Sequence, residues 1–171
     1  LNNMSQGLCM FDAQNRLVVW NQRYVEMYRI DPKRIWVGCN VRDLLDARIA
    51  AGTFTLDPVK YDNDLRDALK EGKTFITDVE LDDGRCIAVV NRPMMGGGWV
   101  ATHEDITERT RAERELARTR AFLDAVISHV PTPIVVKDAE TFRYLLVNKA
   151  AEKFFGLGGA NMIGKTSREV F

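Results

Sequence analysis

Residues 91–109 read NRPMMGGGWVATHEDITER, and this stretch decides the fold. Pro93 ends one strand, because proline cannot donate a hydrogen bond to a sheet ladder, and three glycines then make a turn. Trp99–Glu104 forms the next strand and leads into a charged helix, where Asp105 and Glu108 have the spacing of a capping box. The stretch therefore predicts two antiparallel strands, the second of which runs directly into a helix.

The chain before this stretch carries further strand and helix patterns. Two short runs of β-forming residues, 7–12 and 17–20, flank a polar turn and predict a hairpin. Asn21 follows, and Asn is a favoured N-cap because its side-chain oxygen accepts a free backbone N–H. Helical spacing of apolar residues then gives three helices, and a period of two gives two strands around an Asp-Asp-Gly turn. The predicted order is β-β-α-α-α-β-β-β.

The opening pattern recurs near the end of the chain. Residues 4–45 and 130–171 share an apolar strand, an Asp turn, a second strand, an Asn, a helix and a Gly in one order, and Asn148 corresponds to Asn21. Internal repetition of this kind indicates tandem modules. We expect residues 129–171 to be the N-terminal part of a second module, and the chain to be a fragment of a longer protein.

A helical linker is predicted over residues 108–128, between the two modules. Apolar residues recur there at alternating spacings of four and three, which is a heptad seam. The seam consists of Ala112, Leu116, Thr119, Leu123 and Val126. One interpretation is an amphipathic helix packed on its own domain. The interpretation we prefer is a parallel coiled coil that joins two copies of the chain in a homodimer.

This order of elements, with Asn before the first helix and Asp-Ile-Thr after the last strand, resembles the PAS domain. The resemblance covers residues 1–107 and is most specific in Met4–Asp12, Asn21–Tyr28 and 91–109; residues 130–171 resemble the first half of a second PAS domain. It implies an α+β fold, in which short helices cover one face of a five-stranded antiparallel sheet. The long linker helix and the partial second PAS domain would follow.

The resemblance also implies a function. Its subtype is found in bacterial sensory proteins, often upstream of GGDEF and EAL domains, so we expect a cytoplasmic sensory input to a cyclic-di-GMP enzyme in the same polypeptide. The input region of a sensor histidine kinase and a ligand-free dimerisation module are the alternatives. The signal would leave through the junction Asp105, Ile106 and Thr107.

A small ligand or cofactor of such a module would sit between the sheet and the helices. We expect seven residues to line that pocket, although aromatic residues at these spacings can equally form a core. They are Met10, Tyr24, Met27, Tyr28, Phe54, Trp99 and His103.

The identity of a cofactor stays open, but two types are not expected. Flavin photosensors of this fold carry a reactive Cys at the position where this chain has Val41, and Cys39 lies two residues away, so no covalent flavin site is expected. Haem sensors of this fold place a His on the long helix, and residues 59–71 contain none.

Composition excludes several other functions. With 24 basic and 24 acidic residues, the chain has no net field to attract nucleic acid. No apolar run approaches the roughly 20 residues that span a bilayer, so no membrane contact is expected within this segment. Three widely spaced cysteines and two histidines form neither a metal site nor a nucleophile–base pair. We therefore expect a non-catalytic segment without a metal, whose thiols are buried or semi-buried and stay reduced in the cytosol.

Overall fold

The computed structural model describes residues 5–171, so Met4, where the sequence repeat begins, lies outside the described residues. The chain divides into two compact units, and the division falls between Arg111 and Ala112. Each unit is built around its own antiparallel sheet.

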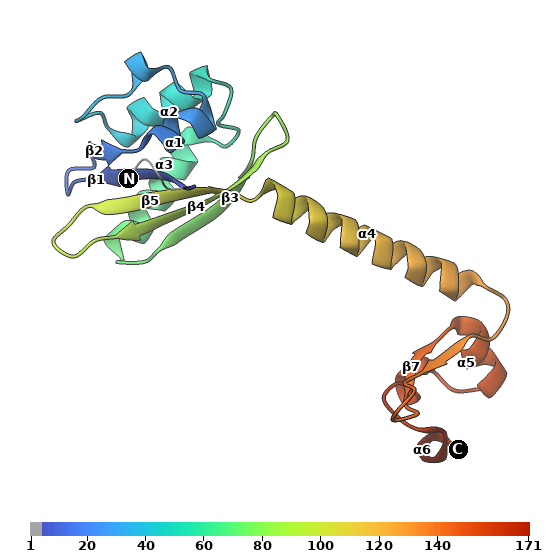
Figure 1. Cartoon of the computed structure of the whole chain (residues 1–171). Helices are drawn as coiled ribbons and strands as arrows, with labels where there is room; N and C mark the ends of the chain where they lie inside the picture. The colour runs from blue at the N-terminus through green and yellow to red at the C-terminus, as the bar shows by residue number, and fades with distance from the viewer. Residues whose placement is uncertain (1–4) are drawn as a thin grey trace. The chain divides into compact units, whose positions relative to one another are not determined.

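A five-stranded antiparallel sheet forms the base of the first unit, as the sequence predicted (Figure 1). In chain order, the strands are β1 (Gly7–Phe11), β2 (Leu17–Trp20), β3 (Phe75–Glu80), β4 (Cys86–Pro93) and β5 (Trp99–Asp105). Their spatial order is β2-β1-β5-β4-β3. The first strand of this unit, β1, therefore lies beside its last strand, β5, with Cys9 opposite Ala101 and Phe11 opposite Trp99.

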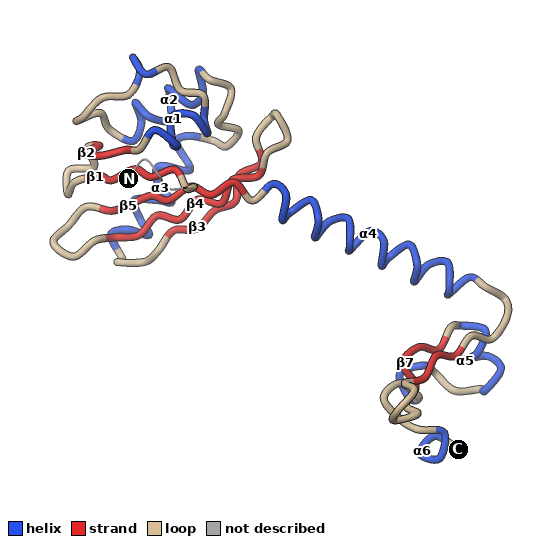
Figure 2. Tube along the Cα trace, viewed as in Figure 1, coloured by secondary structure: helices blue, strands red, loops and turns tan. Residues whose placement is uncertain are grey.

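The helical layer contains the three predicted helices and one short 3-10 turn. These elements are α1 (Gln22–Tyr28), η1 (Pro32–Arg34), α2 (Val41–Ala50) and α3 (Pro58–Lys70). Tyr28 from α1, Leu45 from α2 and Leu65 from α3 are buried in one core with Val89 and Trp99 of the sheet. The order β-β-α-α-α-β-β-β is confirmed (Figure 2). The core lies between the helices and the sheet.

Asn21 holds the first strand and the first helix together. Its Oδ1 accepts hydrogen bonds from the backbone N–H of Tyr24, at 3.0 Å, and of Leu8, at 2.9 Å. Its amide nitrogen donates to the carbonyl oxygen of Gln6 at 2.9 Å. One buried side chain is thus both the predicted N-cap of α1 and a clamp on β1.

The second unit repeats this arrangement. A two-stranded sheet joins β6 (Val135–Lys137) to β7 (Tyr144–Val147), and the helices that follow are α5 (Lys149–Phe155), η2 (Gly159–Asn161) and α6 (Ser167–Val170). Asn148 Oδ1 accepts from the backbone N–H of Ala151 and of Ile134, both at 2.9 Å, and its amide donates to the Thr132 carbonyl. The match of Asn148 to Asn21 is therefore confirmed in its hydrogen bonds.

The predicted linker helix forms α4 (Thr107–His129), the longest helix in the structure. Its residues are mostly polar and charged. Within the part of the chain that the structure describes, no helix combines the length and the apolar character needed to cross a membrane.

The glycine turn between β4 and β5 packs against the end of β1. Gly98 has φ +77°, and a Cβ there would overlap with the Phe11 carbonyl oxygen and approach the Asp12 carbonyl carbon to 3.1 Å. Gly96 also has a positive φ, of +89°, but a Cβ there would meet nothing within 4 Å. Both glycines therefore have a backbone conformation that is strained for any other residue, but only Gly98 is also packed closely against another strand.

We therefore predict that Gly98→Ala lowers the free energy of unfolding more than Gly96→Ala does. A left-handed conformation costs a non-glycine residue about 1–2 kcal/mol, and both variants carry this strain, but only Gly98→Ala must also displace β1. Urea unfolding of the two purified variants measures the difference. Equal losses would show that the turn does not pack on β1 in solution.

Candidate functional site

A small cavity of about 20 Å³ lies between the sheet and the helices of the first unit. This volume exceeds the roughly 10–15 Å³ that one water molecule needs. Its polar lining consists of Cys9, Tyr24, Arg48, Tyr61, Asn91 and His103, and its apolar lining of Phe11, Val41, Leu44, Leu45, Leu65, Trp99 and Ala101. The cavity therefore has room for a very small molecule, and its polar groups come from both layers.

The structure brings only part of the predicted pocket together. Tyr24, Trp99 and His103 line the cavity, whereas Met27, Tyr28 and Phe54 pack in the surrounding core. Tyr28 still touches the cavity wall, since its hydroxyl bonds to His103.

Met10 is a correction to the predicted pocket. Cys9 and Phe11 are each 1% exposed and point into the core, while Met10 between them is only half-buried. Because successive side chains of a strand point to opposite faces, Met10 lies on the far face of the sheet. Cys9 takes its place in the cavity lining.

His103 and Tyr28 form a buried hydrogen-bonded pair. The Tyr28 hydroxyl lies 2.8 Å from His103 Nδ1, and the two rings meet edge to face. Burial, together with the charge of Arg48, holds the pKa of His103 well below its usual range. Burial raises the pKa of Tyr28 to about 12. Both groups are therefore neutral near pH 7.

Arg48 is the main functional candidate that the sequence analysis missed. It is 2% exposed, its guanidinium stacks over the Tyr28 ring at 3.7 Å, and Nη2 donates to the Thr53 carbonyl at 3.2 Å. Nε is buried without a hydrogen-bond partner among the described residues. One signal was available: Arg48 follows Leu44 by four residues and Leu45 by three, which places it on the buried face of α2.

The charge of Arg48 is not balanced within the cavity. None of the described lining residues is acidic. Burial raises the pKa of Cys9, Tyr24 and Tyr61 and lowers that of His103, so these groups are uncharged near pH 7. A buried charge without a counter-ion costs several kcal/mol. Stacking on Tyr28 offsets about 2 kcal/mol of this.

The cysteines fit the prediction of buried thiols. Cys9, Cys39 and Cys86 are all free and buried, and burial raises the pKa of Cys9 and Cys39. Val41 lines the cavity, whereas Cys39 is not among its described lining residues. Cys9 reaches the cavity from the sheet as a protonated, weakly nucleophilic thiol.

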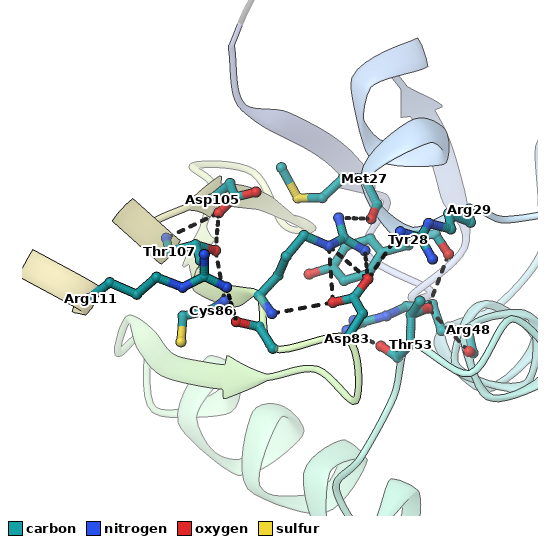
Figure 3. A network of polar contacts seen from close by, with 12 residues as sticks. Met27, Tyr28, Arg29, Arg48, Thr53, Asp83, Cys86, Asp105, Thr107 and Arg111 are labelled. Carbon is teal, nitrogen blue, oxygen red and sulfur yellow. Dashed lines mark hydrogen bonds and ion pairs between the residues drawn. The ribbon is translucent and has the colours of Figure 1, made fainter. Parts of the chain in front are cut away.

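The predicted signal junction is held to the start of β4 (Figure 3). The Thr107 hydroxyl donates to the carboxylate of Asp105 and accepts from the backbone N–H of Cys86, at 3.0 Å. The backbone N–H of Ile106 donates to the Cys86 carbonyl at 2.9 Å. Asp105 is the last residue of β5, so its carboxylate reaches Thr107 instead of forming the expected capping box with Glu108.

The turn between β3 and β4 contacts the end of α1. Arg85 Nη1 donates to the Met27 carbonyl at 2.6 Å, and its other nitrogens bind Asp83. Arg29 forms an ion pair with the same carboxylate at 3.2 Å. Partial burial opposes ionisation, but the hydrogen bonds and charge of Arg85 and the charge of Arg29 outweigh it and lower the pKa of Asp83.

The same turn also contacts the first turns of α4. Arg111 Nη2 donates to the Gly84 carbonyl at 3.4 Å, and Gly84 lies between the two residues that bind the end of α1. Figure 3 shows this continuous polar network, from Tyr28, Arg48 and Thr53 to Asp105, Thr107 and Arg111. We call the segment Asp83–Arg85 the coupling turn.

The predicted seam on α4 is exposed. Leu116 is 72% exposed, Leu123 51% and Val126 47%, and Phe122 beside them is 66% exposed. Ala112 and Thr119 are exposed as well. The helix thus presents a row of large apolar side chains that the described chain leaves uncovered.

Comparisons with known proteins agree with this architecture. A family model described as PAS fold matches residues 1–114, and a second model of the same description matches residues 121–171. The non-motile and phage-resistance protein of Caulobacter vibrioides is 26% identical over 161 residues, which cover 90% of this chain and 18% of that protein. The chain therefore spans less than a fifth of that relative's length.

Solved structures of similar fold include two bacterial PAS domains. The PAS domain of a protein from Colwellia psychrerythraea has a TM-score of 0.45 at 15% identity, with 63% of this chain and 91% of that chain covered. The PAS domain of BvgS from Bordetella pertussis has a TM-score of 0.46 at 17% identity, with 70% and 90% covered. On the two family matches, the chain belongs to the PAS family, as a sensory and signalling input module in which one PAS domain is joined to a second, partial one.

Proposed function

We propose that this input module passes a change in the cavity, through the coupling turn and α4, to an effector domain in the same polypeptide. The observation that carries the proposal is the position of Arg85. Its side chain bonds to the end of α1, and its neighbour Gly84 bonds to α4. A small movement of α1 relative to the sheet would therefore reach both the coupling turn and the output helix.

Such a relay needs two packings that a ligand can tell apart. The polar contacts at the coupling turn are few and partly exposed, since the Asp83 side chain is 29% exposed and the Arg85 side chain 22%. Contacts of this kind can rearrange without opening the core. The junction at Thr107 is buried and joins the last strand to α4, so it would carry the movement onward.

The effector we propose is a cyclic-di-GMP enzyme with GGDEF or EAL domains. Support comes from the resemblance of residues 91–109 to the PAS subtype that often precedes such domains. The alternatives are a sensor histidine kinase and a ligand-free dimerisation module. Incubating the parent protein with GTP, cyclic-di-GMP or ATP separates them: cyclic-di-GMP formed or consumed supports the proposal, and autophosphorylation supports a kinase.

We also propose that the effector is driven by a homodimer joined through α4. By their spacing in the sequence, Leu116 and Leu123 have equivalent heptad positions, and Ala112, Thr119 and Val126 have the other core position. A second copy of the chain offers the same row of side chains in the same register. Pairing would cover the apolar surface that the described chain leaves open.

If the coupling turn relays the signal, Arg85→Met changes effector output in the parent protein. The variant keeps the aliphatic stem but removes the bonds to Met27 and Asp83. Arg92→Met, an exposed change at the far end of β4, is the matched control. Product formation with each variant is the measurement. Equal outputs of wild type, Arg85→Met and Arg92→Met would rule out a role for the turn.

Replacing the Thr107 hydroxyl should loosen the junction. Thr107→Val leaves the buried Cys86 N–H without an acceptor, at a cost of about 1–3 kcal/mol, whereas Thr107→Ser keeps the bond. Urea unfolding gives the stability, and hydrogen exchange at the Cys86 amide locates the change. Thr110→Val, one turn along α4, controls for the loss of a hydroxyl. Unaltered hydrogen exchange at the Cys86 amide in Thr107→Val would contradict the hydrogen bond between Cys86 and Thr107.

Polar residues in the seam should dissociate the dimer. Leu116→Gln with Leu123→Gln removes both leucines from one heptad position, so we expect a monomer by native mass spectrometry. Ala117→Gln with Ala121→Gln alters the same helix outside the seam and should leave the dimer intact. A dimer that survives the leucine changes would move the interface elsewhere.

A further inference from the structure

We propose that the cavity beside Arg48 binds a small monocarboxylate, whose negative charge pairs with the buried guanidinium. This inference rests on the proposed sensory function and names the class of its ligand. It begins from the buried, unpartnered Nε of Arg48, a residue that lines the cavity.

The charge of the site selects an anion. Arginine stays protonated in proteins, and Arg48 faces a lining without any acidic residue among the described ones. The titratable groups around it, Cys9, Tyr24, Tyr61 and His103, are neutral near pH 7. A single negative charge would therefore neutralise the cavity.

The geometry of the donors favours a carboxylate. A guanidinium N–H forms a short, charge-assisted hydrogen bond with a carboxylate oxygen, which is about twice as strong as a bond between neutral groups. Nη2 is already bonded to the Thr53 carbonyl, so Arg48 is fixed in place, while its Nε–H remains free. Neutral His103 and the amide of Asn91 add polar groups on the sheet side of the cavity.

Size and lining limit the rest of the ligand. The cavity of about 20 Å³ is little larger than the space one water needs, so it excludes a ring system or a second charged group, and even a short carboxylate enters only with a shift of the lining side chains. Leu44, Leu45 and Leu65 form an apolar wall that suits a short alkyl group. Acetate has the required charge, planar head and small apolar tail, and it serves as the probe.

Binding would act on the route already described. Arg48 stacks on Tyr28 and bonds to the Thr53 carbonyl, and the Thr53 hydroxyl donates to the Tyr28 carbonyl at 3.1 Å. Tyr28 is the last residue of α1, next to the Met27 carbonyl that binds Arg85. A carboxylate that binds Arg48 would shift its guanidinium and, through these contacts, the end of α1. The coupling turn contacts that end of the helix.

The test measures thermal unfolding of the whole chain with acetate and with acetamide, a neutral molecule of the same shape, at constant ionic strength. We expect acetate to raise the melting temperature and acetamide to leave it unchanged. Arg48→Met should weaken acetate binding roughly 10- to 100-fold, the equivalent of one charged hydrogen bond. Arg42→Met removes an exposed arginine of the same helix, paired with Asp46, and should bind acetate as the wild type does.

Three results would overturn the site: no stabilisation of the wild type by acetate, equal stabilisation by acetamide, or unchanged acetate binding in Arg48→Met. If Arg48→Met fails to fold, the Nε–H resonance of Arg48 in the wild type decides. A saturable shift with acetate alone supports the site, and a constant resonance overturns it. The relay is judged separately, because the Arg85→Met and Thr107→Val experiments do not involve acetate.

Discussion

The hydrogen bonds of Asn21 are the constraint on which the rest of the first unit depends. They fix where β2 ends its pairing with the start of β1, at Gln6 and Leu8, and where α1 starts. Because α1 must then cross β1 at Gly7, the Cα of Tyr24 comes within 3.1 Å of the position where a Cβ would stand. This close approach seats Tyr24 and Tyr28 against His103 and so defines one wall of the cavity. Asn148 makes the equivalent hydrogen bonds in the second unit. The two units therefore share this Asn hydrogen-bonding pattern as well as the order of their elements.

Local patterns were enough to predict the order of strands and helices. Alternation in β3 to β5, helical spacing in α1 to α3 and the two Asn caps are read within a few residues of one another. Other features join residues far apart in the chain. The hydrogen bond between the Cys86 amide and the Thr107 hydroxyl depends on the strand register. The capping box expected at Asp105 was wrong because β5 continues through that residue.

The candidate site was predicted only in part, for reasons that particular residues make plain. Tyr24, Trp99 and His103 were placed in the cavity because strand parity and helix spacing face them inward. Met10 was assigned to the wrong face, since an apolar residue in a buried strand does not itself reveal which face it occupies. Arg48 was missed because a charged residue is normally assigned to the surface. Here Arg48 is buried on the same face of α2 as its aliphatic neighbours, and its guanidinium stacks on the Tyr28 ring.

Trp99 gives the cavity a built-in optical reporter. Its ring stacks on Phe11 at 4.0 Å, its Nε1 donates to Asn15, and it is 4% exposed at the cavity wall. Trp36, in contrast, is 50% exposed, and Trp20 is half-buried. A shielded indole emits at shorter wavelengths than one in water, so the short-wavelength side of the intrinsic emission belongs mainly to Trp99. Because Trp99 lines the cavity, a molecule bound there would contact this indole, whose emission can be followed without a dye or a label.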